Sequence, residues 1–457
     1  MMGGSSAGAG DRTRRVVPLE TLHGSLSDPL LDTMNFLNEI TSRYPAAISL
    51  APGRPYEGLF ETEAVHEYLD AFTGHLRDGG LADREIRTAL FQYGRTKGQI
   101  HRLLAETLAN DEGIDVAPEG VVVTVGAQEA MVLVLRALFA GPDDVLLVSS
   151  PCYIGITGAA RLLDVPVVPV PEGRDGVDPE TLRAVARREA ARGRRPRAFY
   201  VVPDFANPSG ASMPVAARER LLEVAAEEDL LVIEDNPYGF FTRDVAPRPT
   251  LKSLDRDGTV VYLGSFAKTA FPGARLGYVL ADQTVLRGDG RRGLLADELA
   301  KVKSMITVNT PSLSQAVIGG MLVRHGCRLR DANDASIAFY RRNLRTVLEE
   351  LERHFPGGGD VTWNSPEGGF FTVLTVPFVA DEAALERSAR EFGVLWTPMD
   401  AFFVGGDGRH QLRVSSSYLE PERVAEGIGR LAAFIVAETA RARGAVTSGA
   451  GSSATSG

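Results

Sequence analysis

Short apolar runs alternate with longer charged segments through the middle of this sequence, and the alternation restricts the possible folds more than any other feature. The first pair is a β-branched run at 120–125 followed by a helical segment at 128–139. Further strands are expected at 145–149, 167–170, 198–202, 230–234 and 260–263, with helices such as 179–192 and 215–228 between them. This order predicts βαβ units and an α/β fold with a largely parallel, helix-covered sheet.

A smaller α+β portion is predicted after this region. Helical segments at 294–305 and 311–325 lead out of the sheet, and a helix at 336–354 precedes strands at 370–376 and 412–415. With 457 residues, of which 44% are hydrophobic, the chain is long enough for two domains. The predicted divisions are a disordered tail at 1–20, an N-terminal arm and part of the small domain at 21–75, a large domain at 76–329, a small domain at 330–442 and a disordered tail at 443–457.

Charge and cysteine content argue against several classes of partner. The net charge is −10, and the basic residues are 44 arginines and five lysines without a basic tract, so we expect no nucleic-acid partner. The two cysteines, Cys152 and Cys327, are too few for a disulfide framework, and no metal site is predicted. No apolar stretch approaches the roughly 20 residues of a membrane helix, and the start lacks a signal-peptide core. We therefore expect no membrane association and a cytoplasmic location.

Polar residues collect in the loops after the predicted strands, where open parallel sheets bind ligands. Gly126-Ala127-Gln128 begins a helix whose free N–H groups favour phosphate, and Tyr153 offers an aromatic face to a flat ligand. Asn207 opens an Asn-Pro-Ser-Gly turn, and its amide is able to donate to a ligand oxygen. Asp235 ends an apolar strand, so it is expected to need a cationic partner. Packing for Tyr153 and a simple turn at Asn207 are the structural alternatives.

Lys268 closes another apolar strand and is the strongest candidate for chemistry. A partly desolvated lysine near other cations loses its proton readily and forms a Schiff base with an aldehyde. Pro272-Gly273 forces a turn that is able to bring Arg275 back towards Lys268. Ser265, Lys268 and Arg275 would then face one anionic ligand. The alternative is an ordinary lysine at a strand end.

The order of these motifs from about residue 48 to 435 resembles the aminotransferase class I/II family of pyridoxal-phosphate enzymes with the type I fold. The resemblance implies pyridoxal 5'-phosphate as cofactor, with Lys268, Asp235 and Tyr153 as catalytic residues. Lys268 would hold the cofactor aldehyde, Asp235 would pair with the ring nitrogen, and Tyr153 would stack on the ring. The remaining implied cofactor contacts are Asn207 and Tyr238 at the ring hydroxyl oxygen, and Gly126, Ala127, Gln128, Ser265 and Arg275 at the phosphate.

Two more matches complete the implied site. Tyr93, in Gln-Tyr-Gly, resembles the tyrosine that reaches the phosphate of the neighbouring subunit, which implies a homodimer with shared active sites. Arg413 resembles the arginine that binds the substrate α-carboxylate; alone, it would be read as a surface arginine. The sequence departs from relatives at Ala267, where a serine is common, and at Met399-Asp400, which we expect near the substrate entrance.

The segment at 49–58 resembles the N-terminal stretch that covers the substrate in the aminoadipate-like branch, which includes transaminases of phenylglycine-type antibiotic building blocks. Arg54 and Tyr56 are the specificity candidates, although Pro-Gly-Arg-Pro also suits a rigid turn. The function implied is amino transfer between an aromatic, phenylglycine-type or dicarboxylic L-amino acid and a 2-oxo acid, in specialised or natural-product metabolism. Elimination, replacement or oxidation on the same cofactor is the alternative. A DNA-binding sensor is disfavoured, because the roughly 45 residues before the resemblance are too few for a winged-helix domain and its linker, and they carry no basic recognition helix.

Overall fold

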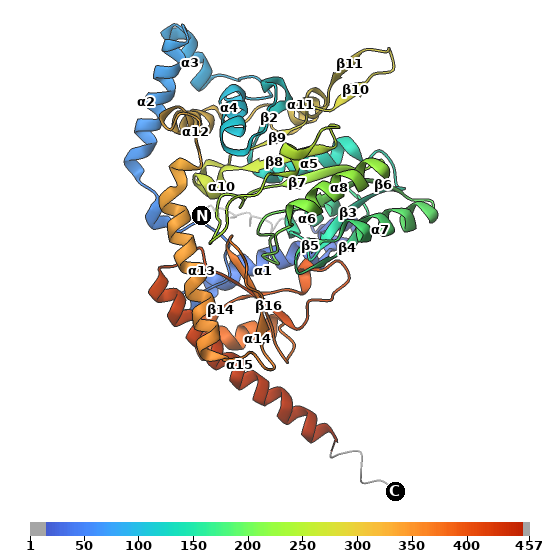
Figure 1. Ribbon diagram of the computed structural model, residues 1–457, viewed down its shortest axis with the longest axis vertical. Helices are drawn as coiled ribbons and strands as arrows, with labels where there is room; N and C mark the ends of the chain where they lie inside the picture. The colour runs from blue at the N-terminus through green and yellow to red at the C-terminus, as the bar shows by residue number, and fades with distance from the viewer. Residues whose placement is uncertain (1–14, 451–457) are drawn as a thin grey trace, which may run out of the picture.

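A mixed sheet of eight strands forms the centre of the large domain (Figure 1). The computed structural model describes residues 15–450, without the side chains at 32–35, 37–38 and 445–450. The strand order is β2-β9-β8-β7-β6-β3-β4-β5. The bounds are β2 (Val121–Thr124), β3 (Asp144–Ser150), β4 (Val167–Gly173), β5 (Gly176–Val177), β6 (Arg195–Val201), β7 (Leu231–Asp235), β8 (Val260–Ser265) and β9 (Gly277–Leu280).

Helices cover this sheet, as the alternating sequence predicts. The pairs β4–β3, β3–β6, β6–β7 and β7–β8 are parallel, and apolar side chains form a core on each face of the sheet. The helices of this region are α4 (His101–Glu112), α5 (Gly126–Leu138), α6 (Ile154–Leu162), α7 (Pro179–Ala191), α8 (Val215–Glu227), α9 (Leu251–Leu254), α10 (Phe266–Thr269), α11 (Leu295–Ile306) and α12 (Ser312–Arg324). The predicted α/β fold with a mostly parallel sheet is confirmed.

Strand β9 was not predicted, and together with the short β5, which pairs antiparallel with β4, it makes the sheet mixed. Strand β9 lies between β8 and β2 in the sheet and pairs antiparallel with both. The connection from β8 contains only α10 and a 3-10 turn at Pro272–Ala274, which is too short for a parallel crossover. A four-residue run directly after a turn gives little periodicity to detect.

A second apolar core lies in the small domain and joins both ends of the chain. Ile40 and Leu50 pack there with residues from 347 to 435. Strand β1 (Ile48–Ser49) pairs with β14 (Val394–Leu395), and the small sheet has the order β12-β13-β16-β15. The other bounds are α1 (Pro29–Arg43), α13 (Asp334–His354), β12 (Thr362–Trp363), β13 (Phe371–Thr375), α14 (Glu382–Arg387), β15 (Thr397–Pro398) and β16 (Gln411–Ser415). Helix α2 (Thr62–Asp78) instead packs against α12 of the large domain, and α3 (Asp83–Phe91) follows it.

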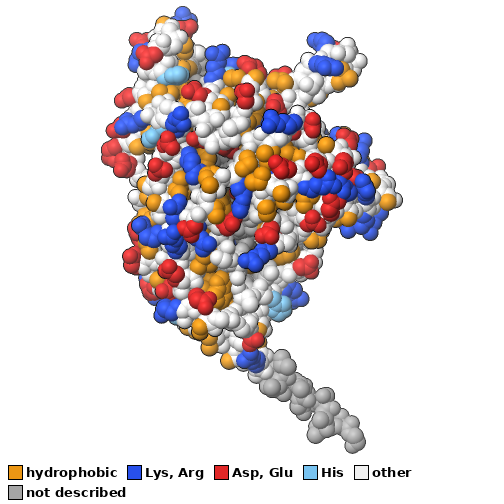
Figure 2. All heavy atoms as spheres, in the orientation of Figure 1, with side chains coloured by type: hydrophobic (Ala, Val, Ile, Leu, Met, Phe, Trp, Pro, Cys, Tyr) orange, Lys and Arg blue, Asp and Glu red, His pale blue; other side chains and the backbone are white. Residues whose placement is uncertain are grey.

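Two elements extend from the body of the molecule. The hairpin of β10 (Thr284–Leu286) and β11 (Arg292–Leu294) stands clear of the large domain, with basic side chains near its tip (Figure 2). Helix α15 (Pro421–Ala450) continues past residue 443, where the sequence predicts a tail. The parts of the predicted tails at 1–14 and 451–457 lie outside the described residues. None of the helices in residues 15–450 is long and apolar enough to cross a membrane.

Candidate active site

Lys268 lies directly beyond the end of β8, in the single turn α10. The Ser265 hydroxyl caps this turn by accepting from the Ala267 N–H at 3.2 Å. The Lys268 Nζ donates to the Gly53 carbonyl oxygen at 2.6 Å. Burial lowers the pKa of Lys268 to about 8, and the positive charges of Arg413 and Arg275 add to that effect. Its amine is therefore far easier to deprotonate than that of an exposed lysine.

Asp235 is buried at the end of the neighbouring strand β7. Burial raises the pKa of its carboxyl to about 6, while a hydrogen bond from Tyr200 and the charge of Lys268 act in the opposite direction. Tyr200 Oη donates to Asp235 Oδ2 at 2.7 Å. The other oxygen, Oδ1, is buried without a hydrogen-bond partner among the described residues. Asp235 was expected to have a cationic partner, but it forms no direct ion pair with any described residue. Its Oδ1 is therefore left for a bound group.

Tyr153 precedes α6 and lies over the start of α5. Its hydroxyl is 3.5 Å from Oε1 of Gln128, whose Nε2 donates to the Gly155 carbonyl at 3.2 Å. A Cβ atom at Gly155 would be only 2.3 Å from the Tyr153 ring, so a glycine is needed for the ring to take this position. Burial raises the Tyr153 pKa to about 12, which keeps its hydroxyl protonated.

The start of α5 lies against the Arg275 guanidinium, an arrangement suited to an anion. Gly126 has a φ of +71°, and a Cβ atom there would be 2.6 Å from Nη2 of Arg275. The backbone of Gly277 approaches equally closely, since a Cβ on it would be 2.7 Å from the Ala127 nitrogen. The N-terminus of α5 and a guanidinium therefore lie together, with Ser265 at the next strand end. Backbone N–H groups, a helix dipole and a fork of donors suit a phosphate.

Arg413 comes from β16 of the small domain and reaches the loop after β6. Its Nη1 donates to Oδ1 of Asn207, and its Nη2 donates to the Ala51 carbonyl at 3.2 Å and to Oγ1 of Thr397 at 3.3 Å. The guanidinium is buried, and burial lowers its pKa to about 10. Its Nε has no partner among the described residues. These three bonds use three of the five guanidinium N–H groups, and a buried cation with donors left over is suited to bind a carboxylate.

Tyr238 is buried near this pair. Its ring packs edge-on against Phe370 and Phe371, with ring centroids 5.3 and 5.8 Å away. The Asn207 amide hydrogen-bonds to the Tyr238 hydroxyl, although burial dominates and raises the pKa of Tyr238. Asn207 and Tyr238 therefore lie together as predicted, with the Arg413 guanidinium on the other side of Asn207.

The backbone at 51–54 covers Lys268 and Arg413, through the carbonyl groups already described. Gly53 is required here, because a Cβ atom would be 2.2 Å from the Phe371 ring. The specificity candidates on this segment are paired elsewhere. The Arg54 guanidinium lies 4.0 Å from the centroid of the Tyr418 ring, and Tyr56 stacks on Phe339 and donates to Glu420.

The structure also places Tyr93 and the pair Met399-Asp400, which were singled out in the sequence. Tyr93 is 84% exposed and lies at the surface of the chain. Met399 is fully buried against Ile154 and Phe402, and its expected place near the substrate entrance stays a prediction. Its apolar side chain packs behind Phe402, whose ring centroid is 5.0 Å from the Arg413 guanidinium. Asp400 next to it is exposed.

Tyr200 and Thr397 contact the predicted site residues, and sequence reasoning missed both. Tyr200 carries a hydroxyl in the apolar last four residues of β6, and a buried hydroxyl usually has a hydrogen-bond partner. That partner requirement was a detectable signal. Thr397 lies in a two-residue strand whose pairing with Arg413 is visible only in three dimensions.

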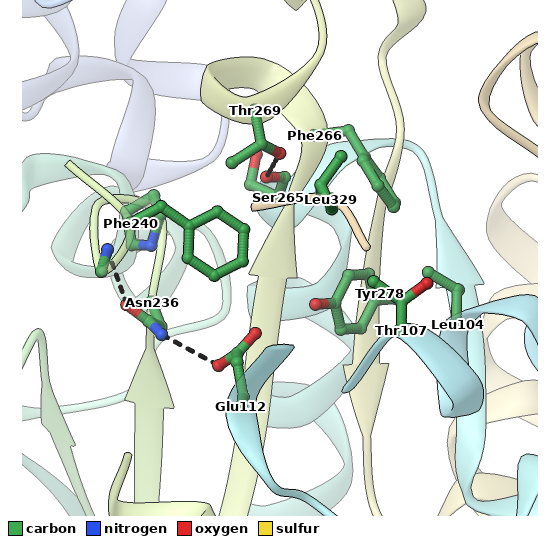
Figure 3. A pocket seen from close by; sticks show the side chains of 12 residues that line it. Leu104, Thr107, Glu112, Asn236, Phe240, Ser265, Phe266, Thr269, Tyr278 and Leu329 are labelled. Carbon is green, nitrogen blue, oxygen red and sulfur yellow. Dashed lines mark hydrogen bonds between the residues drawn. The ribbon is translucent and has the colours of Figure 1, made fainter. Parts of the chain in front are cut away.

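A small cavity of about 20 Å³, lined by both polar and apolar side chains, lies behind the strand ends (Figure 3). Glu112 at the end of α4 accepts hydrogen bonds on Oε2 from the Tyr262 hydroxyl at 2.6 Å and from Nδ2 of Asn236 at 3.2 Å. Burial raises the pKa of Glu112 to about 7. Asn236 also accepts from the Gly239 N–H at 3.1 Å, so this network fixes the chain directly after Asp235.

A family model described as "Aminotransferase class I and II" matches residues 74–431. The chain is 55% identical over 420 residues to the (S)-3,5-dihydroxyphenylglycine transaminase of Amycolatopsis orientalis, covering 92% of this chain and 94% of that protein.

Solved structures of aminotransferases are also similar to this chain. The multiple substrate aminotransferase of Thermococcus profundus superposes with a TM-score of 0.78 at 29% identity, over 92% of this chain and 99% of that one. LysN, the α-aminoadipate aminotransferase of Thermus thermophilus, superposes with a TM-score of 0.76 at 29% identity, over 92% and 98% of the two chains. The LysN structure is a complex with N-(5'-phosphopyridoxyl)-L-leucine.

Proposed function

Because this chain belongs to the aminotransferase class I and II family, we propose that it transfers the amino group of a phenylglycine-type amino acid with a hydroxylated ring. The 55% identity to a dihydroxyphenylglycine transaminase over nearly the whole of both chains is the observation that carries this substrate class. The relatives named above are transaminases and aminotransferases, which favours amino transfer over elimination, replacement or oxidation. The acceptor is a 2-oxo acid.

The residues at the strand ends fit pyridoxal 5'-phosphate as cofactor. The unpartnered Oδ1 of Asp235 suits a protonated ring nitrogen, and the anion site at Gly126 and Arg275 suits the phosphate. Tyr153 would lie against the ring face, and Asn207 and Tyr238 offer donors to the ring hydroxyl oxygen. When bound, this cofactor supplies an electron sink for the negative charge that develops at the substrate Cα.

Lys268 is the residue that holds and moves the proton in this proposal. Its Nζ has a pKa lowered to about 8, so the neutral amine is accessible near neutral pH. This neutral amine would hold the cofactor aldehyde, and when the substrate amine displaces it, the freed amine would accept the proton from the substrate Cα. The Gly53 carbonyl that accepts from Nζ keeps the amine inside the site.

Arg413 binds the α-carboxylate of the substrate. Asn207, Thr397 and the Ala51 carbonyl already hold the Nη atoms, so the guanidinium is oriented before substrate arrives. The rings of Phe371 and Phe402 flank it and exclude water, which strengthens a charged contact. Orientation in advance lowers the entropy lost on binding.

A homodimer with shared active sites is part of the proposal. Phe91 and Tyr93 are exposed, and so are apolar side chains at the end of α11 and directly after it, where Met305 is 83% exposed. Ser312 Oγ donates to the Leu90 carbonyl at 2.6 Å, so these two segments adjoin. Apolar side chains of this size at one place favour a protein partner. A second copy would bring Tyr93 to the partner's phosphate site and cover this surface.

The location and the metabolic role are proposed more broadly. We place the enzyme in the cytoplasm and in specialised amino acid metabolism, such as the supply of building blocks for antibiotics. The similarity to a dihydroxyphenylglycine transaminase supports this role, since such amino acids lie outside ordinary protein synthesis. The specificity candidates Arg54 and Tyr56 remain predictions.

Single-turnover mixing of the purified enzyme with amino acids tests the proposal. The enzyme is loaded with pyridoxal 5'-phosphate and mixed separately with 3,5-dihydroxyphenylglycine, phenylalanine and 2-aminoadipate. Stoichiometric pyridoxamine phosphate and keto acid, formed fastest from the phenylglycine, are expected. Release of ammonia with the cofactor unchanged would contradict amino transfer, and faster conversion of 2-aminoadipate would contradict the substrate class.

A further inference from the structure

The Asp235 carboxylate is held by a side chain from the adjacent strand. Tyr200 lies in β6 and Asp235 ends β7, and these strands pair in parallel with Tyr200 opposite Ile233. The Tyr200 hydroxyl donates to Oδ2 of Asp235 at 2.7 Å, and both side chains are buried. This bond therefore fixes one of the two Asp235 carboxylate oxygens at the carboxyl end of the strands.

Several other groups face Asp235 from the elements around it. They are Lys268 on α10, Cys152 and Tyr153 between β3 and α6, and Tyr238 after β7. Within the described residues, Tyr200 is the hydrogen-bond partner of this carboxylate, and Oδ1 has none. The hydroxyl of Tyr200 thus decides which oxygen is held by the protein and which is left free.

We propose that Tyr200 is a positioning residue, whose hydroxyl orients Asp235 so that Oδ1 is the oxygen available to the ring nitrogen of the cofactor. The inference rests on the proposed function for the identity of that nitrogen. The orientation itself is a property of the chain, because the bond is present between two of its own side chains.

The electrostatics of the pair support the direction of the bond. Burial, together with the charge of Asp235, raises the pKa of Tyr200 well above its usual value, so its hydroxyl keeps the proton and donates it. The same hydrogen bond lowers the pKa of Asp235 against the effect of burial. Removing the hydroxyl would leave the buried carboxylate without a partner and would raise its pKa further above 6.

The conservative variant Tyr200→Phe tests this in the full chain without cofactor. A carboxyl whose pKa is raised by folding stabilises the fold when protonated, and this stabilisation is lost as pH rises through the folded pKa. Because the pKa of Asp235 is expected to be raised further in Tyr200→Phe, this variant should lose more stability as pH rises. We therefore expect the gap in denaturant midpoint between wild type and Tyr200→Phe to widen from about pH 5 to about pH 8.

Asp235→Asn supplies the matched background. In this background the gap caused by Tyr200→Phe is expected to be equal at the two pH values, because the titrating group is gone. A gap in the wild-type background that does not change with pH would overturn the proposal, and so would a widening that persists in Asp235→Asn. A purely structural role for the ring predicts the first of these contrary results.

A second substitution keeps the test informative if Tyr200→Phe does not fold. Site-specific 3-fluorotyrosine at position 200 retains the ring and makes the hydroxyl a stronger donor. It is expected to lower the pKa of Asp235, so the loss of stability with rising pH should be smaller than in wild type. A larger loss, or an unchanged one, would overturn the proposal.

The loaded enzyme provides a second readout. Tyr200→Phe is expected to lower kcat by about 10-fold, the effect of one lost charged hydrogen bond, with a smaller change in KM. The control is Tyr262→Phe, a fully buried tyrosine of the next strand whose hydroxyl bonds to Glu112. An equal loss in both variants would contradict a specific role. If pyridoxal phosphate does not bind at all, the proposed function fails, while the stability test still decides the orientation of Asp235.

Discussion

Arg413 in the small domain donates a hydrogen bond from Nη1 to Oδ1 of Asn207 in the large domain. The two residues are 206 positions apart, and this bond brings the proposed carboxylate-binding and cofactor-binding groups into contact. Because Asn207 accepts through its oxygen, its amide nitrogen is left facing the Tyr238 hydroxyl. This contact between the two domains therefore orients both ends of the Asn207 side chain.

Arg413→Lys is expected to raise KM for the amino acid and to lower kcat/KM by about 10- to 100-fold. A lysine cannot donate to Asn207, Thr397 and a carboxylate in one plane, and lost charged hydrogen bonds cost about 1.5–3 kcal/mol. Steady-state kinetics measure the change. The exposed Arg409→Lys is the control, and equal kinetics for the two variants would contradict the assignment.

Lys268→Ala is expected to lower turnover by at least about 100-fold while the chain remains folded, since a lost proton-transfer group typically costs that much. The visible absorbance of the bound cofactor should change as well. Circular dichroism checks the fold, and Lys301→Ala, an exposed lysine of α11, is the control. A fully active Lys268→Ala enzyme would refute the proposed site.

Asp235→Ala is expected to retain part of the cofactor and to lower kcat by about 100-fold or more, because a buried charge that stabilises the transition state is lost. Binding through the phosphate site and through Arg413 should persist. Cofactor content is measured by absorbance, and kcat and KM by steady-state assay. A change confined to KM would show that Asp235 serves binding rather than chemistry.

Glu112→Gln is expected to stabilise the protein at about pH 8 by on the order of 1 kcal/mol and to have little effect at about pH 5. Burial raises the pKa of Glu112 to about 7, so the fold favours the protonated acid and loses this stabilisation as pH rises through 7. Glutamine does not ionise and still accepts from Tyr262 and Asn236. Denaturant unfolding at both pH values measures the effect, with the exposed Glu119→Gln as control. Destabilisation that is stronger at the higher pH would contradict this sign.

Met305→Asp is expected to weaken the proposed dimer, because it places a charge on an apolar surface that a second copy would bury. Light scattering after size exclusion should show a shift to lower mass and a loss of activity at low enzyme concentration. Leu286→Asp, on the projecting hairpin and 69% exposed, is the matched control. Unchanged mass for Met305→Asp would locate the interface elsewhere.

Much of the fold and of the candidate site was predictable from sequence. The strands ending near Val125, Val202, Glu234 and Leu263 are confirmed, because buried parallel strands are continuous apolar runs that helices separate. The carboxyl ends of such strands meet at one edge of the sheet. Polar residues just beyond these ends therefore lie together, which is why Lys268, Asp235, Asn207 and Gly126 were recognised as one group.

Tertiary structure decided what holds those residues. The bond from Tyr200 to Asp235, the pairing of Arg413 with Asn207 and the antiparallel direction of β9 all depend on strand register, which local periodicity does not encode. The side chains of Arg54 and Tyr56 likewise have partners in the small domain, 364 residues away in the case of Tyr56 and Glu420. The sequence alone thus determined the elements and the chemical groups. Only the packed chain determined their partners, because a partner is chosen by distance in space and not by distance along the chain.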